Sequence, residues 1–199
     1  VVNEKLGGSV QDAPQSIQLV TAKTLSEEAV TNLQDALKNV PGITLNAGEG
    51  TARGDTVNLR GFPAFNDFFL DGIRDAGLYT RDAFDLETLE VLKGPSAILF
   101  GRGSTGGVIN QVTKAATLNP VEAATLQFGT NSQVRATGDL DMPIGPASAF
   151  RINAMAERSE VSDRDFVRNR RWGIAPTATI GIGEPDSVEL SYLHQQQHD

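Results

Sequence analysis

From about Val121 onward, apolar and polar residues alternate with a period of two. The alternation is carried by runs that begin near Leu140, Phe150, Trp172 and Val188. Successive side chains of a β-strand point to opposite faces, so this pattern predicts strands with one apolar and one polar face. Turn residues separate the runs, and the region therefore predicts an antiparallel meander of five strands.

Alternation alone leaves two kinds of sheet open. A soluble antiparallel domain with one wet face has this pattern, and so do the strands of a membrane barrel. The chain has no run of about 18 apolar residues, which excludes a spanning helix and leaves barrel strands possible. Five strands cannot close a barrel, because natural membrane barrels begin at about 8 strands.

The connections between these strands are unequal in length. Residues 145–148 and 183–186 contain glycine and proline and predict tight turns, whereas residues 159–169 form a longer charged connection. Barrels of the outer membrane have short turns on the periplasmic side and longer loops outside. In a barrel, residues 159–169 are therefore expected to face outward from the cell.

The first part of the chain has a different rhythm. Residues 16–21 alternate like a short strand, and residues 24–38 carry apolar side chains at helical spacing. Thr24 and Glu27 predict a capping box at the start of this helix. Pro41 and Gly42 are expected to end it.

Short elements are expected in the rest of this part. Residues 56–59 and 67–70 predict strands, residues 71–72 a tight turn, residues 86–92 a helix turning into a strand, and residues 108–113 a strand. Together these elements predict an α+β arrangement.

Composition excludes several classes of function. The chain has 199 residues, no cysteine and a formal net charge of −8. The absence of cysteine removes disulfides, thiolate metal sites and cysteine nucleophiles. Nucleic acid is not expected as a partner, because phosphate binding depends on concentrated Lys and Arg.

Residues 101–106 match the dinucleotide-binding pattern GxGxxG. That pattern binds pyrophosphate only where a helix follows it. Residues 107–113 begin with glycine and continue with β-branched residues, which favours a glycine-rich turn between strands. No serine has the nucleophile-elbow spacing, and His194 and His198 on one strand are about 13 Å apart, too far to share a metal.

Five short motifs occur in order between residues 59 and 110. They are LRGF at 59–62, LDG at 70–72, EVLKGP at 90–95, LFG at 99–101 and GGVIN at 106–110. In order and spacing, they closely resemble the plug domain of TonB-dependent outer-membrane receptors, especially the ferric-siderophore branch.

This resemblance implies an α+β plug domain, a mixed sheet with short helices, over residues 1–119. Residues 120–199 are then the first antiparallel strands of a transmembrane β-barrel, of about 22 strands when complete. The chain is expected to be the N-terminal part of a larger receptor. The family's TonB box is not recognisable in residues 1–6 and is expected upstream.

The resemblance also implies a function. The protein is expected to be a receptor in the bacterial outer membrane, not an enzyme, that imports a ferric siderophore with energy from TonB. Residues 79–85 resemble the catecholate version of their loop, so a ferric catecholate is preferred. Alternatives are haem, cobalamin or a carbohydrate as cargo, and a nucleotide-binding α/β enzyme. No resident cofactor or metal is implied, because the siderophore carries the iron.

Two groups of residues carry the expected site. The resemblance implies ligand binding by the apex residues Arg53, Phe65, Asn66, Tyr79 and Arg81. Arginine complements an anionic chelate, and aromatic rings suit catechol or aryl groups. A buried charge network is implied for Arg60, Glu87, Glu90, Lys93 and Arg102.

The outer connection adds further arginines at 164, 168, 170 and 171. These cations suit either attraction of an anionic ligand or contact with outer-membrane lipid and lipopolysaccharide. The sequence leaves both interpretations open.

Overall fold

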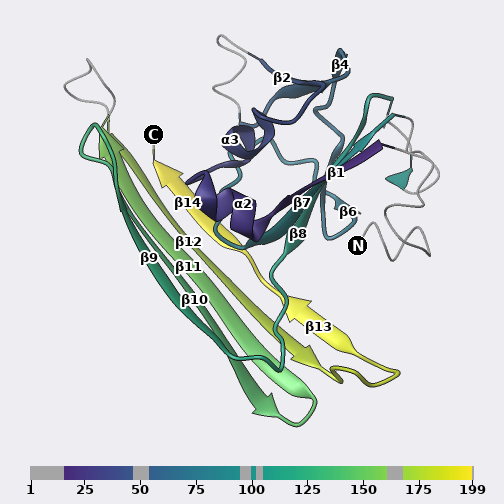
Figure 1. The fold of residues 1–199 in the computed structure, drawn as a ribbon, viewed down its shortest axis with the longest axis vertical. Helices are drawn as coiled ribbons and strands as arrows, with labels where there is room; N and C mark the ends of the chain where they lie inside the picture. The colour runs from purple at the N-terminus through teal and green to yellow at the C-terminus, as the bar shows by residue number, and fades with distance from the viewer. Residues whose placement is uncertain (1–15, 47–53, 95–99, 102–104, 161–167, 199) are drawn as a thin grey trace. The chain divides into compact units, whose positions relative to one another are not determined.

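The computed structural model describes residues 16–46, 54–94, 100–101, 105–160 and 168–198. The chain forms two compact units, Val1–Thr113 and Lys114–Asp199 (Figure 1). Lys114 and Thr117 contact strands of the second unit, and the predicted domain boundary between residues 119 and 120 stays a prediction.

The first unit contains two sheets. The larger has the strand order β1-β7-β8-β5-β6, and the smaller the order β2-β3-β4. Their bounds are β1 Ser16–Thr21, β2 Ile43–Leu45, β3 Val57–Leu59, β4 Phe62–Pro63, β5 Phe68–Leu70, β6 Ile73–Arg74, β7 Leu86–Lys93 and β8 Gly107–Thr113. The β5–β8 pair is parallel and the other pairs are antiparallel, so the predicted mixed sheet is confirmed.

The helical segment differs from its prediction. Instead of one helix over residues 24–38, there are two short helices, α2 Ala22–Glu27 and α3 Leu33–Leu37. Thr21, not Thr24, caps the first, and its hydroxyl accepts from the Thr24 amide. Asn32 caps the second by accepting from the Asp35 amide at 2.9 Å. The first helical run ends before Ala29, where φ is +50°, and the second cap lies inside the predicted helix.

Strand β7 is central to the larger sheet, between β1 and β8. The predicted helical start at residue 86 was wrong, because Leu86 already pairs with Thr113 of β8 and pairing with β1 follows from Thr88 onward. Leu89 and Val91 belong to a core with the two helices, whereas Leu92 packs in a second cluster with Phe69 and Val108. Both faces of β7 are therefore buried.

The two glycines at the start of β8 allow close backbone packing. A Cβ on Gly106 would lie 2.3 Å from the Leu59 carbonyl oxygen, and one on Gly107 would lie 2.0 Å from that of Leu92. Residues 107–113 form a strand. The dinucleotide site of the enzyme alternative needs a helix there, so that interpretation was wrong.

The second unit is a meander of long strands. Its order is β9-β10-β11-β12, with both β13 and β14 against β12. The bounds are β9 Val121–Phe128, β10 Val134–Gly145, β11 Ser148–Glu160, β12 Arg168–Ile180, β13 Val188–Ser191 and β14 His194–His198. The last two pair with separate segments of β12, on either side of Pro176, which has no amide proton to donate. The sheet therefore has six strands in five positions, one strand more than predicted, because β13 and β14 share one position.

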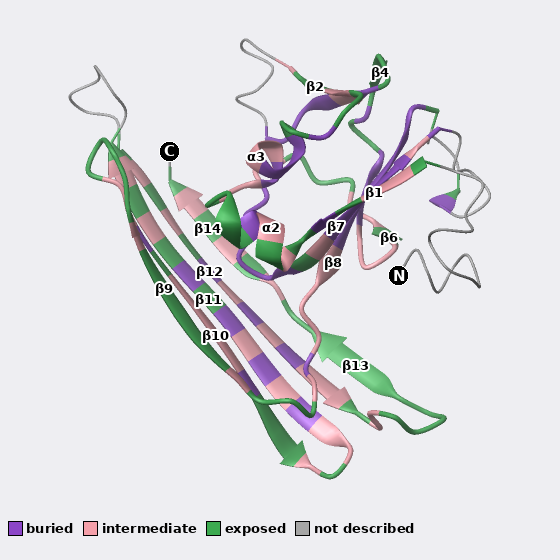
Figure 2. Cartoon of the chain, viewed as in Figure 1, coloured by how far each residue is buried: buried purple, intermediate pink, exposed green. Residues whose placement is uncertain are grey.

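The two faces of this sheet differ in polarity. The register places even-numbered side chains of β9–β14 on one face and odd-numbered ones on the other. The even-numbered face, here called the apolar face, carries large exposed side chains such as Leu126, Trp172 and Leu190. The odd-numbered polar face is more buried, and buried residues recur at alternate positions along β11 (Figure 2).

Charged groups on the polar face are paired. Arg151 donates to both carboxylate oxygens of Asp139 at 2.8 Å and to the Ala115 carbonyl at 2.9 Å. Arg135 pairs with Glu157 at 2.7 Å. Among the described residues, no helix is long and apolar enough to span a membrane.

Candidate functional site: the Arg81 loop

Arg81 is the centre of the loop between β6 and β7. Its side chain is 2% exposed. Nε donates to Asp75 Oδ2 at 2.8 Å, and Nη1 lies 3.4 Å from Asp55 Oδ2. Nη2 donates to the Gly77 carbonyl at 2.8 Å. Two carboxylates and a carbonyl from separate segments thus hold one guanidinium.

Two aromatic rings enclose the same guanidinium. Its central carbon lies 4.2 Å from the ring centroid of Tyr79 and 4.7 Å from that of Phe68. A cation over an aromatic face is attracted by the ring quadrupole, most strongly when water is excluded. The guanidinium of Arg81 therefore packs against one face of the half-buried Tyr79 ring and holds the ring in place.

Hydrogen bonding sets the protonation of this loop. The Tyr79 hydroxyl donates to Asp75 Oδ2 at 2.8 Å. Burial alone raises the pKa of Asp75, but the hydrogen bond and charge of Arg81 outweigh it and hold the pKa below its usual value. Burial raises the pKa of Tyr79 far above its ordinary value, and Asp75 raises it further against the opposing charge of Arg81. At neutral pH Tyr79 is a donor and Asp75 an anion.

Backbone contacts anchor the loop to the rest of the first unit. The Asp55 amide donates to the Tyr79 carbonyl at 3.1 Å, and the Leu33 amide donates to the Arg81 carbonyl at 2.9 Å. Gly54 has φ +102°, and a Cβ there would lie 2.5 Å from the Tyr79 amide nitrogen. Only glycine allows the two segments to approach so closely.

The turn between β4 and β5 presents Phe65 and Asn66. Both side chains are exposed, and Phe65 is 42% exposed. Arg74 on β6 donates to the Asn66 carbonyl and lies over the Phe69 ring, 4.9 Å from its centroid. The turn is thereby tied to the strand that leads into the Arg81 loop.

Asp67, next in this turn, has a different environment from Asp75. It is buried, and its Oδ1 atom has no hydrogen-bond partner within the described residues. Burial raises its pKa, and the positive charge of Arg74 opposes that shift only in part.

The predicted ligand residues fall into three groups. Tyr79 and Arg81 are brought together, Phe65 and Asn66 are exposed on the neighbouring turn, and Arg53 lies outside the described residues. Arg81 is buried, and its guanidinium already holds Asp55 and Asp75. Its ligand contact stays a prediction, and the described geometry supports a positioning role.

Asp55 was missed by the sequence analysis. It is buried and lies 26 positions before Arg81, in a segment without apolar periodicity. Asp75, the other carboxylate that pairs with Arg81, lies only six residues before it.

Of the described members of the predicted charge network, only Glu90 is buried on this chain, and the network stays a prediction. Its members are Arg60, Glu87, Glu90, Lys93 and Arg102. Arg60 and Glu87 are exposed on this chain, and Arg102 lies outside the described residues. Glu90 is buried and accepts from Asn110 at 2.6 Å, whereas Lys93 donates to Gln18 at 3.1 Å. Glu90 and Lys93 are three apart on β7 and point to opposite faces. Contacts of these residues with a barrel wall stay a prediction.

No group of three or more potential metal ligands occurs in the part of the chain that the structure describes. His194 and His198 lie on strand β14, where the first contacts the Trp172 ring and the second the Gln196 amide. Their predicted position on one strand is confirmed.

Comparison with known proteins places this geometry in context. Residues 9–108 match the family model described as "TonB-dependent Receptor Plug Domain". The catecholate siderophore receptor Fiu of Escherichia coli K12 is 36% identical over 198 residues, which are 98% of this chain and 26% of Fiu. The chain thus spans about a quarter of the length of the curated relatives it matches.

Solved structures agree with this comparison. The crystal structure of the siderophore receptor PiuA from Acinetobacter baumannii matches with a TM-score of 0.92 and 33% identity, covering 99% of this chain and 28% of that chain. The open form of the ferric-catecholate import receptor Fiu from E. coli K12 matches with a TM-score of 0.88 and 35% identity, covering 96% of this chain and 28% of that chain.

Proposed function

Because the chain belongs to the family of TonB-dependent receptor plug domains, we propose that its protein imports a ferric siderophore across the outer membrane, with energy from TonB. The family places the protein in the bacterial outer membrane. One observation supports a ferric siderophore as the cargo. It is the similarity of 98% of this chain to a receptor named for catecholate siderophores. The relatives are receptors rather than enzymes, and transport is proposed without catalysis.

The proposed ligand contacts are aromatic. Phe65 is exposed and Tyr79 is half-buried, so both offer ring surface to an aryl or catechol group. Arg81 has a positioning role in this proposal, because a ligand that bound its guanidinium would have to replace Asp55 and Asp75. No resident metal or cofactor is proposed, since the chelator carries the iron.

Titration of the complete receptor in detergent tests the cargo. Intrinsic fluorescence is followed while a ferric tris-catecholate, a ferric trihydroxamate, haem and cobalamin are added separately. We expect saturable quenching by the catecholate. Tyr79→Ala is expected to weaken binding of the catecholate about threefold to tenfold, which is the usual contribution of an aromatic contact. Tyr192→Ala, an exposed tyrosine between β13 and β14, is the matched control and should change nothing.

Uptake of radioactive iron by cells with and without TonB tests the transport step. Binding without TonB-dependent uptake would reject active import, and preferential binding of haem or cobalamin would reject the siderophore as cargo.

A further inference from the structure

The last residue of the first unit is held from within that unit. Strand β8 ends at Thr113, and Asp71 in the turn between β5 and β6 accepts from the Thr113 amide at 2.9 Å and from its hydroxyl at 2.8 Å. The Asp71 amide donates to the Gln111 carbonyl at 2.8 Å. Hydrogen bonds to a carboxylate are stronger than neutral ones, so the end of β8 is fixed to the β5–β6 turn.

Residues 114–119, which follow directly, have different partners. They belong to the second unit, form neither helix nor strand, and are here called the anchor segment. Backbone groups outside regular structure need other hydrogen-bond partners when they are removed from water. Side chains on the polar face of β10 and β11 supply such partners.

The first two residues of the anchor segment contact three of these side chains. Lys114 Nζ lies 3.0 Å from Asp139 Oδ2 and donates to Asn153 Oδ1 at 3.3 Å. Arg151 Nη1 donates to the Ala115 carbonyl at 2.9 Å. Arg151 and Asn153 are buried. Hydrogen bonds in such a low-dielectric environment are stronger than the same bonds in water.

Asp141 holds the anchor segment further along the chain. It accepts from the Thr117 amide at 3.0 Å, and its Oδ2 atom lies 2.8 Å from the Thr117 hydroxyl oxygen. Asp141 is buried, and so is Ala116, which lies between the contact points. The contacts at Lys114, Ala115 and Thr117 therefore distribute any force on the segment over three residues.

The four side chains that receive the anchor segment form a block of two by two on the polar face. Asp141 is the cross-strand partner of Arg151, and Asp139 is the partner of Asn153. Arg151 also donates to both carboxylate oxygens of Asp139 at 2.8 Å. These bonds fix the block without any contribution from the segment. A preorganised surface of this kind loses little conformational entropy when it binds.

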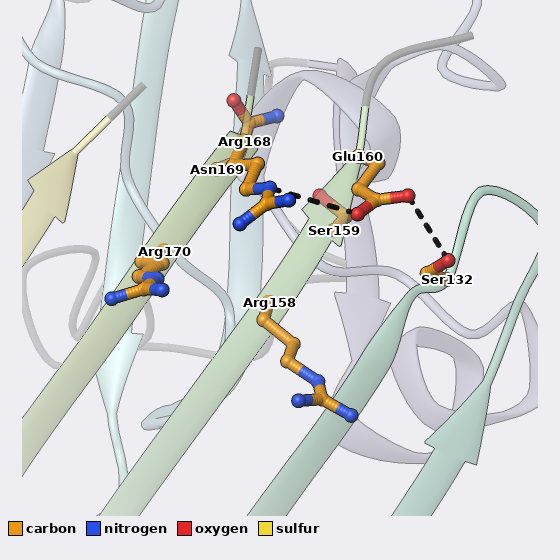
Figure 3. A pocket seen from close by; sticks show the side chains of 7 residues that line it. All are labelled: Ser132, Arg158, Ser159, Glu160, Arg168, Asn169 and Arg170. Atoms are coloured by element: carbon orange, nitrogen blue, oxygen red, sulfur yellow. Dashed lines mark hydrogen bonds and ion pairs between the residues drawn. The ribbon is translucent and has the colours of Figure 1, made fainter. Parts of the chain in front are cut away.

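The ion pair at the opposite end of β11 is exposed. Figure 3 shows Glu160 joined by dashed lines to Arg168 and Ser132, in a pocket of about 320 Å³. The charged atoms of Glu160 and Arg168 are 3.7 Å apart, and both side chains are half or more exposed. Exposed pairs contribute little stability, so this pair is a control for the buried contacts. The predicted contact of Arg168 and Arg170 with an anionic ligand or lipopolysaccharide stays a prediction.

We propose that residues 114–119 are a fixed anchor: when the first unit is displaced during import, the movement ends at Thr113 and the segment stays bound to β10 and β11. The chain changes from partners in the first unit to partners in the second across the peptide bond between Thr113 and Lys114. Releasing the segment would leave buried charges such as Asp141 without a partner for their lost bonds, which is costly. The inference rests on the proposed function, because TonB supplies the force that displaces the first unit.

A disulfide across the anchor tests whether the segment moves during import. The 199 residues contain no cysteine, and Thr117→Cys with Asp141→Cys places two thiols where the side chains now lie in hydrogen-bond contact, within reach of an S–S bond. Uptake of radioactive iron is measured in cells with the complete, otherwise cysteine-free receptor, oxidised and after reduction. We expect the two rates to agree within about twofold, since a constraint that both states satisfy equally shifts neither.

Single-molecule pulling tests the anchor without any cargo. The complete receptor is held in lipid vesicles and pulled through a handle on Ser16→Cys, at the start of β1. In the wild type, release of chain is expected to stop at Thr113. Lys114→Ala combined with Asp141→Ala should lengthen the released chain by about 20 Å, because an extended residue spans about 3.3–3.6 Å. This variant keeps the Asp139 and Arg151 pair, so the receiving strands stay intact.

Arg168→Ala combined with Glu160→Ala is the matched control. It also removes one cation and one anion that pair on the same sheet, but both are exposed. The released length should equal that of the wild type. A boiling-dependent shift in gel mobility first confirms that each variant has a folded barrel.

Two results would overturn the proposal. Loss of uptake in the oxidised double-cysteine variant, restored by reduction, would show that the segment has to move. Equal released lengths for the wild type and the variant at Lys114 and Asp141 would show that these contacts do not set where the movement ends. Absence of uptake by the wild type would instead reject the proposed function, and pulling would still decide the anchor.

Discussion

The two units bury their side chains according to opposite rules. In the first, the central strand β7 has apolar residues packed on both faces, and charges such as Arg81 are enclosed by partners in a loop. In the second, the charged residues Arg135 and Arg151 are buried on the polar face, and large apolar residues are exposed. The comparison shows that strand alternation specifies two faces but not which one meets water.

The largest expected loss of stability comes from a substitution that breaks the buried cluster around Arg81 in the first unit. Arg81→Ala leaves Asp55 and Asp75 without their guanidinium, and loss of one partner from a buried pair costs about 3–5 kcal/mol. Denaturant unfolding of the chain, followed by a probe in the first unit, measures this loss. Lys23→Ala, which removes an exposed ion pair with Glu27, is the control and should cost under about 1 kcal/mol. Equal losses would contradict the assigned role of Arg81.

A smaller effect is expected on the apolar face of the second unit. Ile152→Arg places a cation on the lipid side of β11 and should cost about 2–4 kcal/mol near the bilayer centre. Urea titration of the complete receptor in lipid vesicles measures it. Ile180→Arg, at the end of β12 and opposite Ser148, should cost about 0–1 kcal/mol because it lies close to the interface. Absence of this depth dependence would mean that the face does not contact lipid.

The smallest expected effect concerns two carboxylates of the first unit and pH. Asp75 has a lowered pKa, so its stabilisation is present above its unfolded pKa and is lost as pH falls through the folded one. Asp67 has a raised pKa, so the folded state gains stability as pH falls toward the unfolded value.

Stability profiles between pH 3 and pH 7 distinguish the two carboxylates. Asp75→Asn should remove the acid-induced loss attributed to Asp75, and Asp67→Asn should remove the acid-induced gain attributed to Asp67. Slopes that change in the same direction in both variants would show that the two environments do not differ as described.

Prediction from sequence succeeded where a single periodicity dominates. The meander after Val121 and strand β8 were predicted because period-two alternation and β-branched residues favour strands in any context. The prediction of one helix failed because Asn32 supplies a second cap within residues 24–38, a segment whose apolar spacing fits one longer helix. The prediction for β7 failed at Leu86, where pairing with a neighbouring strand overrides the local preference for a helix.

The candidate site was predicted less completely than the fold. Tyr79 and Arg81 were identified, but the resemblance could not show that Arg81 is enclosed by Asp55, because that contact joins segments 26 residues apart. Such contacts depend on how the chain returns on itself and leave no local pattern.

By itself, the sequence determined the order of the elements, the alternation of faces in the second unit and the resemblance to plug domains. These are local properties, set by side-chain spacing and turn chemistry. Only the tertiary structure decided that Arg81 is buried and that Arg170 and Arg171 lie on opposite faces beside different neighbours. The physical reason is that solvation and pairing of a charge depend on strands and loops that are distant in the chain, which only folding brings together.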